Sequence, residues 1–265
     1  VGSATLGSGT TPVPTSIYAA GRYVYVVDSG ADDLKIFDTS TSSPSQIGRL
    51  TGLGTATKFI TVAGRYAYVA ESGNGADNDS FKVIDVGNPK TPVVVGTISG
   101  LTNVSGLYVS GKYVYISSGA TPTLNIIDVS NPTTPFVIGT LAMDSEGFIR
   151  FVANLIVPVA QAANAAKGSV YVSGQYAYFI DIQTDDLKIV NIAVPSAPLT
   201  IGTLSLGTTV GADNLSIKIA VSGRYAYVID EGADTTGDSF YVIDVSTPTA
   251  PVTLGSALNG GVLKD

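Results

Sequence analysis

Acidic side chains gather in several short polar loops, and these carboxylates are the strongest candidates for chemistry in the chain. Calcium takes oxygen ligands in irregular geometry, so glycine-rich acidic loops can bind it. Segments 77–80 and 234–238 fit best, although neither has the ligand spacing of an EF-hand. The alternative is that the carboxylates are solvated turn residues. The calcium hypothesis covers Asp28, Asp32, Asp33, Glu71, Asp77, Asp79, Asp230, Glu231, Asp234 and Asp238, and a further acidic loop holds Asp181, Asp185 and Asp186.

Other catalytic groups are missing from the sequence. Its 265 residues include no His, no Cys and no Trp. This composition excludes a Ser-His-Asp triad, a thiolate nucleophile, a zinc site of the usual ligands and disulfides. Paired carboxylates could hydrolyse glycosides, but there is no Trp to stack on a sugar or to raise the pKa of a carboxyl group. The sequence therefore predicts a protein that is not an enzyme and requires no cofactor, with calcium as the candidate metal ion.

Charge and hydropathy limit the partners and the location of the protein. The formal net charge is −7 at pH 7, whereas nucleic-acid binding needs a basic surface. No run of 18 apolar residues is present that could span a bilayer. Only 13% of the residues are charged, and the sequence starts at Val1 without a leader. We expect an exported protein, extracellular or at the cell surface, with no nucleic-acid partner and no membrane span.

A repeat organises the chain. A motif of Gly, a polar residue and Tyr-x-Tyr occurs five times, with its glycines 43, 47, 63 and 49 positions apart, at Gly21, Gly64, Gly111, Gly174 and Gly223. Each copy follows a short apolar stretch and precedes a second strand, a turn and a final short strand. Four strands, a to d, in a repeat of about 40–50 residues are typical of a propeller blade.

The sequence therefore predicts an all-β fold, a five-bladed β-propeller of four-stranded antiparallel blades, as one domain over 1–265. The apolar runs of strands b and c fit sheets that are covered on both faces. The Tyr pairs of strand b are interpreted as blade packing. The Asp that ends strand c is expected to accept hydrogen bonds from the following turn. The blades are expected at 17–50, 59–98, 107–141, 169–204 and 217–258.

The strand c pattern resembles that of a known family. Segments 81–85 and 124–128, each followed by Asn-Pro-x-x-Pro and Val-x-Gly, resemble the LVIVD repeat of bacterial and archaeal surface β-propellers. The resemblance covers the chain except about residues 142–168, and the fourth copy departs from it with Asn191 in place of Asp. It implies the propeller fold and says almost nothing of function.

The N-terminus carries one strand more than five blades need. Residues 1–6 match the d strands, and Gly2 lies 46 positions before Gly48, the spacing of one repeat. The fifth repeat already has its own d strand, so 1–16 is predicted to be an extra N-terminal d-like strand and a linker. Three alternatives follow: a five-stranded last blade, a displaced strand, or exchange of the strand with the next subunit. Strand exchange at a sheet edge is head-to-tail and gives an open filament.

A long apolar connection, 142–168, separates the third and fourth repeats. Because loops normally lie in water, one this apolar must be buried. It either covers a blade or the central channel, or it forms a contact patch for a neighbouring subunit. The residues assigned to assembly are Val1, Gly2, Ala4, Leu6, Phe148, Ile149, Phe151, Leu155, Ile156 and Val157.

Three Asn-x-Ser sequons could carry glycans, at Asn78, Asn103 and Asn214. The alternative is coincidence, because such triplets are common in a chain rich in Asn, Ser and Thr.

These features favour a non-enzymatic, exported structural or interaction protein whose partner is itself. We expect it to form an extracellular filament or surface layer by head-to-tail exchange of terminal strands. Its low charge would help, because few charges need to be desolvated when subunits associate. The alternative is a monomeric surface module whose acidic loop face binds calcium or a glycan.

Overall fold

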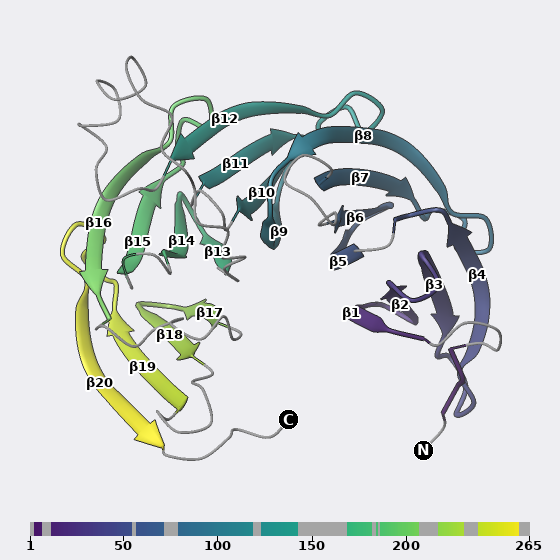
Figure 1. Ribbon diagram of the computed structural model, residues 1–265, viewed down its shortest axis with the longest axis horizontal. Helices are drawn as coiled ribbons and strands as arrows, with labels where there is room; N and C mark the ends of the chain where they lie inside the picture. The colour runs from purple at the N-terminus through teal and green to yellow at the C-terminus, as the bar shows by residue number, and fades with distance from the viewer. Residues whose placement is uncertain are drawn as a thin grey trace, which may run out of the picture. The chain divides into compact units, whose positions relative to one another are not determined.

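The fold is that of a computed structural model of the chain (Figure 1). The structure describes residues 3–6, 12–54, 57–71, 79–118, 123–142, 169–181, 184, 186–206, 217–230 and 238–259. Within these ranges the regular structure is β-strand, and no helix could cross a membrane.

Twenty strands form five sheets in the described residues. The first holds β1 (Pro14–Ala20), β2 (Tyr23–Asp28), β3 (Asp33–Asp38) and β4 (Ser45–Thr51). The second holds β5 (Thr57–Ala63), β6 (Tyr66–Glu71), β7 (Asp79–Asp85) and β8 (Val93–Leu101). The third holds β9 (Val104–Ser110), β10 (Tyr113–Ser118), β11 (Thr123–Asp128) and β12 (Phe136–Ala142). The fourth holds β13 (Val170–Ser173), β14 (Tyr176–Asp181), β15 (Asp186–Asn191) and β16 (Leu199–Ser205). The fifth holds β17 (Ile217–Ser222), β18 (Tyr225–Asp230), β19 (Asp238–Asp244) and β20 (Val252–Asn259).

Each sheet is one blade, and its strands lie in chain order (Figure 1). Neighbouring strands pair antiparallel, as in the fifth blade, where Tyr225 lies opposite Asp244 and Val242 lies opposite Gly255. The fold predicted from the sequence, five four-stranded antiparallel blades, is confirmed. The blade bounds also agree with the expected ranges to within a few residues.

The described part of the extra N-terminal segment does not form a strand. Residues 3–6 belong to no strand among the described residues, and Ala4 is exposed. The first paired strand, β1, starts at Pro14. A d-type strand exists only when a sheet edge supplies its hydrogen-bond partners. The fifth blade has its own fourth strand, β20, in that place.

The chain divides into two compact units, and each is described by itself. Unit 1 comprises Val1–Lys112 with Asp128–Phe136, and unit 2 comprises Tyr113–Ile127 with Val137–Asp265. Unit 1 contains the first two blades and unit 2 contains the last two, while the boundary runs through the third blade. The single domain expected from the sequence stays a prediction.

The repeated Gly-x-Tyr motif makes the turn between strands a and b. The turn has two residues, as in Gly21-Arg22 between β1 and β2. All five motif glycines have φ between 58° and 60°. Glycine takes this left-handed conformation without steric cost, and the type II′ hairpin turn requires it at the first central position. The five glycines are therefore explained by one backbone requirement.

The residue that ends strand c holds the next turn, as predicted. Asp85 Oδ1 accepts a hydrogen bond from Gly87 N at 2.9 Å, and Asp128 Oδ1 accepts one from Ser130 N at 2.8 Å. Asp38 and Asp244 do the same. Asn191 does so in the fourth blade, at 2.9 Å to Ala193 N. The fourth copy therefore departs from the repeat in sequence but keeps the same hydrogen bond to the turn.

A glycine in four of the five d strands lets the next blade approach closely within each compact unit. A Cβ on Gly48 would overlap the carbonyl oxygen of Pro89, which lies in the c–d turn of the following blade. The same overlap would arise at three further glycines, Gly96 with Pro132, Gly139 with Pro195 and Gly202 with Pro248. A β-bulge precedes the glycine in several d strands, as between Ile189 and Val190 opposite β16. Each glycine thus marks a blade-to-blade junction.

Beyond the glycine contacts, apolar side chains fill the space between neighbouring blades. In unit 1, Val27 and Leu34 of the first blade share a buried cluster with Ile60 and Val62 of the second. In unit 2, Ile180 and Leu187 of the fourth blade share one with Ile219 and Val221 of the fifth. We call the side of a blade that faces the following blade its rear face, and the side that faces the preceding blade its front face.

Candidate functional site

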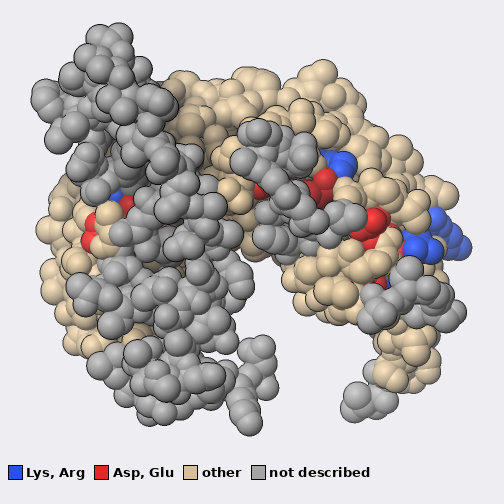
Figure 2. Space-filling view, viewed as in Figure 1, with Lys and Arg blue, Asp and Glu red and all other residues tan. Residues whose placement is uncertain are grey.

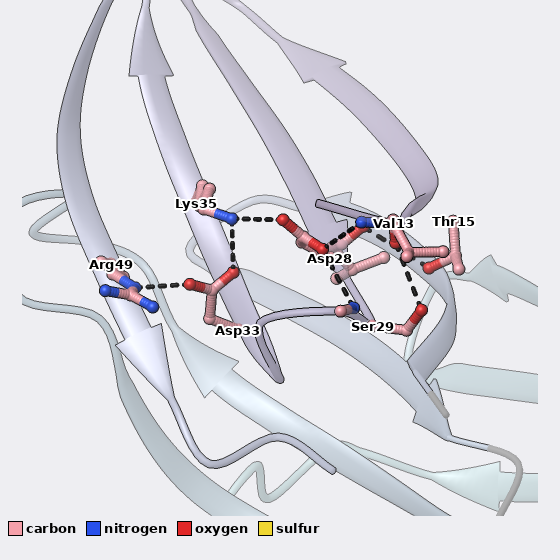
Figure 3. A network of polar contacts seen from close by, with 9 residues as sticks. Val13, Thr15, Asp28, Ser29, Asp33, Lys35 and Arg49 are labelled. Carbon is pink, nitrogen blue, oxygen red and sulfur yellow. Dashed lines mark hydrogen bonds and ion pairs between the residues drawn. The ribbon is translucent and has the colours of Figure 1, made fainter. Parts of the chain in front are cut away.

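The acidic residues of the first b–c loop lie in a buried ion-pair network and do not form an open site (Figure 3). Asp28 Oδ2 accepts a hydrogen bond from Lys35 Nζ at 2.5 Å, while its Oδ1 accepts bonds from Val13 N at 2.8 Å and Gly30 N at 3.1 Å. Asp33 lies 3.1 Å from the same Nζ and also pairs with Arg49. Both carboxylates are fully buried. The ammonium group of Lys35 therefore stands where a cation would have to bind.

Burial alone would raise the pKa of Asp28, because it disfavours the charged carboxylate. The hydrogen bonds from Lys35, from Val13 N and from Gly30 N outweigh burial, so the pKa of Asp28 lies below its usual value. Asp28 is therefore an ionised, charge-compensated structural group at neutral pH.

The second and fourth blades repeat this arrangement with other residues. Lys82 Nζ donates to Glu71 Oε2 at 2.5 Å and to the carbonyl oxygen of Leu53 at 2.6 Å. Lys188 Nζ donates to Asp181 Oδ2 at 2.6 Å. Asp79 Oδ2 accepts a bond from Val104 N at 2.7 Å. Carboxylates that the sequence suggested as metal ligands therefore bind lysine or backbone N–H groups.

The lysine partner was missed in the sequence, yet the repeat carries a signal for it. The acid is the last residue of strand b, and the lysine lies diagonally opposite it on strand c, as the pairing of Val26 with Lys35 shows. Where the third blade has Asn125 in place of lysine, it also has Ser118 in place of the acid. Acid and base are thus both present or both absent in the first four repeats, whereas the fifth keeps an acid, Asp230, and has Tyr241 at the lysine position.

The described residues give little support to the calcium hypothesis. Among the residues that the structure describes, no three carboxylates are grouped so that they could hold a metal ion. Asp32 is half-buried in a left-handed backbone conformation with φ 52°. Asp77, Glu231 and Asp234 lie outside the described residues, as do the side chains of Asp230 and Asp238. Calcium binding at those loops stays a prediction.

A second set of ion pairs links the a–b turn to the end of strand c. Arg22 pairs with Asp38, Arg65 with Asp85 at 2.6 Å, and Arg224 with Asp244 at 3.2 Å. The exposed Arg22 and Arg65 guanidinium groups, with turn N–H groups, hold the pKa values of Asp38 and Asp85 below their usual range. At Asp128 and Asp244 the leading cause of the lowered pKa is the hydroxyl of the turn serine, Ser130 or Ser246.

These lowered pKa values predict a loss of stability in acid. A carboxyl group whose pKa is lower in the folded state stabilises the fold above its unfolded pKa, about 3.9, and loses that contribution as the pH falls through the folded value. Urea unfolding should therefore give a constant free energy between pH 7 and about 5 and a decline below about 4. Asparagine at Asp38, Asp85, Asp128 and Asp244 should flatten the decline, because Asn191 makes the same turn contact. An equally steep decline in that variant would contradict this assignment.

The Tyr pairs of strand b pack between blades. The second Tyr of each pair is buried in the first four blades, at Tyr25, Tyr68, Tyr115 and Tyr178. Burial raises the pKa of Tyr115 to about 12. This supports the interpretation of the pairs as packing residues.

Of the predicted glycosylation sites, only Asn103 lies in the described part of the chain. It joins β8 to β9, is half-buried and has φ 44°. Asn78 and Asn214 lie outside the described residues, and so does most of the apolar connection, 143–168, with the assembly residues assigned to it. Val1 and Gly2 also lie outside. Glycosylation stays a prediction.

Two sheet faces expose apolar side chains that are buried at the equivalent positions elsewhere. On the rear face of the fifth blade, Ile229 is 40% exposed and Phe240 is 38% exposed. Their fourth-blade equivalents, Ile180 and Leu187, are fully buried. On the front face of the first blade, Ile17 is 69% exposed, whereas its fifth-blade equivalent, Ile219, is 7% exposed. The first blade lies in unit 1 and the fifth in unit 2, and each face is described within its own unit.

Five four-stranded antiparallel blades with glycine junctions define a β-propeller protein. The family model of the LVIVD repeat matches residues 15–51, 54–99, 102–142, 166–205 and 216–258. The chain therefore belongs to the LVIVD repeat family. A search of curated proteins found no match to this sequence.

Solved structures share the fold at low sequence identity. A functionally unknown protein from Desulfotomaculum acetoxidans matches with a TM-score of 0.69 and 13% identity, over 96% of this chain and 72% of that one. A Lactobacillus plantarum protein gives 0.68 and 15%, over 94% and 72%. The periplasmic gluconolactonase of Pseudomonas aeruginosa gives 0.65 and 13%, over 91% and 70%. At these identities the likeness shows the fold alone.

Proposed function

We propose that this chain is a non-enzymatic, exported structural protein that assembles head-to-tail into an extracellular filament or surface layer. The observation that carries the proposal is the d-like segment at the N-terminus: the five sheets have four strands each, and residues 3–6 belong to none of them. This segment and the sheet edge that would receive it are the two unlike halves of one contact. A contact between unlike halves does not pair two copies symmetrically, so it extends into an open array unless the rotation closes a ring.

The spacing of the N-terminal segment along the sequence supports this contact. Gly2 precedes the turn glycine Gly21 by 19 positions. Inside the chain, the d-strand glycine precedes the next turn glycine by 16, 15 and 21 positions at three junctions, for example from Gly48 to Gly64. By this spacing, residues 1–6 would reach the blade that precedes the first one, which in the assembly is the last blade of a neighbouring copy. They would add there to the free edge of β20 through main-chain hydrogen bonds.

The surface and the ion pairs agree with a structural role. On the described part of the face in Figure 2, few atoms belong to acidic or basic residues. A weakly charged surface loses little hydration energy when copies associate. Asp28, Glu71 and Asp181, which could have served as catalytic acids or metal ligands, are paired with lysines.

Removal of residues 1–11 tests the proposal. The truncation spares Val13, whose N–H group donates to Asp28, so the melting temperature of the dilute chain should stay unchanged. Filaments or layers seen by negative-stain microscopy in the full chain should be lost. A matched control replaces residues 1–6 with a Gly/Ser segment of equal length and should fail in the same way. Normal assembly of the truncated chain would refute strand exchange.

A further inference from the structure

We propose that the chain has a small-molecule site between the a–b turns of the fourth and fifth blades, and that it binds a hydroxylated ring bearing a carboxylate, the chemistry of a uronic acid. A cavity of about 420 Å³ lies there, within the range of about 300–1,000 Å³ that is usual for ligand pockets. Its lining residues all belong to unit 2, so the cavity is described within one compact unit. This inference goes beyond the proposed function and does not depend on assembly.

Both blades contribute polar and aromatic residues to the wall of this cavity. The fourth blade supplies Gln175, Tyr176 and Tyr178, and the fifth supplies Arg224, Val245 and Ser246. Among the described residues that line the cavity, Arg224 is the one that carries a charge. The wall therefore combines a cation with amide and hydroxyl groups and with aromatic side chains.

The fourth copy departs from the repeat at the wall of this cavity. In the other four blades, the base of the a–b turn pairs with the acid that ends strand c of the same blade, as Arg65 pairs with Asp85 at 2.6 Å. The fourth blade has amides at both positions, Gln175 and Asn191. Asn191 still holds the turn through Ala193 N, so the fold does not require the loss of the charge pair. A departure that the fold does not require, on the wall of a cavity, points to a ligand.

Side chains on both walls have hydrogen-bond donors that a ligand can use. Gln175 Nε2 donates to the hydroxyl oxygen of Tyr176 at 2.8 Å, which leaves the hydroxyl hydrogen of Tyr176 to donate. Arg224 lies over the ring of Tyr225, 4.9 Å from its centroid, and pairs with Asp244 at 3.2 Å. Its side chain is 59% exposed, and a guanidinium group has more N–H donors than one ion pair uses. Arg224 is therefore oriented and can bind a second carboxylate.

These groups define the chemistry of the ligand. A planar guanidinium group matches a carboxylate in charge and geometry. The amide of Gln175 and the hydroxyl of Tyr176 suit ligand hydroxyl groups, which both donate and accept. Aromatic side chains present large apolar surface against which a sugar ring can pack. One ring that carries a carboxylate and several hydroxyl groups uses all three features.

D-glucuronate and D-glucose are matched probes of this site, because they differ in the carboxylate at one carbon. Ligand-observed NMR titrations of the dilute full chain should show glucuronate binding at least about tenfold more tightly than glucose. Arg224→Gln should weaken glucuronate binding by about tenfold or more and leave glucose binding nearly unchanged. The melting temperature should hold, because exposed ion pairs contribute little to stability. Arg22→Gln, the same substitution in the first blade, is the matched control and should leave both affinities unchanged.

Gln175→Ala is a second variant that leaves the ion pair of Arg224 intact, and it should weaken the binding of both sugars. Binding of neither sugar to the wild-type chain would overturn the inference, and equal binding of the two would refute the carboxylate. An equal loss in Arg224→Gln and Arg22→Gln would also overturn it, since the site would then not lie at this junction. The chain without residues 1–11 should bind glucuronate as the full chain does, so a failure of assembly and a failure of this site are distinguishable.

Discussion

Gly202→Ala should destabilise the folded chain by about 3 kcal/mol, although it adds a single methyl group. The added Cβ would overlap the carbonyl oxygen of Pro248 and crowd Cδ of Pro251. Both obstacles belong to the backbone or to a proline ring, so neither can rotate away. The turn that carries them is fixed at its start by the hydrogen bond from Ser246 N to Asp244. Relief therefore requires the fourth and fifth blades to separate, which opens the cluster around Ile189 and Ile219.

Urea unfolding at low protein concentration measures this effect, and Gly255→Ala is its control. Gly255 has the same place in its strand as Gly202, and no described atom would meet its Cβ. The control should therefore change the free energy of unfolding by less than about 0.5 kcal/mol. Equal destabilisation by the two substitutions would show that strand propensity or bulge geometry, and not the junction, requires the glycine.

Lys188→Met should cost about 3–5 kcal/mol, because it leaves the fully buried carboxylate of Asp181 without its charge partner. The methionine fills a similar volume, so lost packing contributes little. The pair lies between strands β14 and β15, each of which has neighbours on both sides, and water cannot replace the ammonium group without opening the blade. Asp181→Ser should also destabilise, since it removes the carboxylate that accepts a hydrogen bond from the buried ammonium group of Lys188.

The double variant Asp181→Ser with Lys188→Asn should recover most of this loss. It installs the combination that the third blade already has, Ser118 and Asn125. There, Asn125 Oδ1 accepts a hydrogen bond from Thr140 at 3.1 Å, and Thr203 is the equivalent residue in the fourth blade. A double-mutant cycle from urea unfolding gives the coupling free energy. Additive losses, with no recovery in the double variant, would contradict the pairing of acid and lysine.

The repeated sequence allowed us to predict the features that depend on local backbone chemistry. Gly111 and its four equivalents predicted tight turns, because a positive φ is a property of the residue itself and needs no distant partner. Asp85 and its equivalents predicted turn contacts for the same reason, since the bond reaches only two residues along the chain. Strand number and blade bounds followed from these turns.

Features that depend on burial could not be predicted in the same way. Asp28 was interpreted as a calcium ligand or a solvated residue, but it is buried beside Lys35 because strands b and c are central in the sheet. The position of Lys35 on the sheet follows from cross-strand register, which no single loop displays. The glycines of the d strands were visible as a pattern. The reason for these glycines was not visible, because the atom that leaves no room for a side chain at Gly48 lies in the next blade, on Pro89.

The most direct test of the account is the mass of the intact chain in solution as its concentration rises. Sedimentation velocity, with negative-stain microscopy of the same samples, should show a 27.1 kDa monomer at low concentration and extended head-to-tail assemblies above a threshold. A chain that remains a 27.1 kDa monomer at every concentration, with Ile17, Ile229 and Phe240 exposed to solvent, would contradict the account.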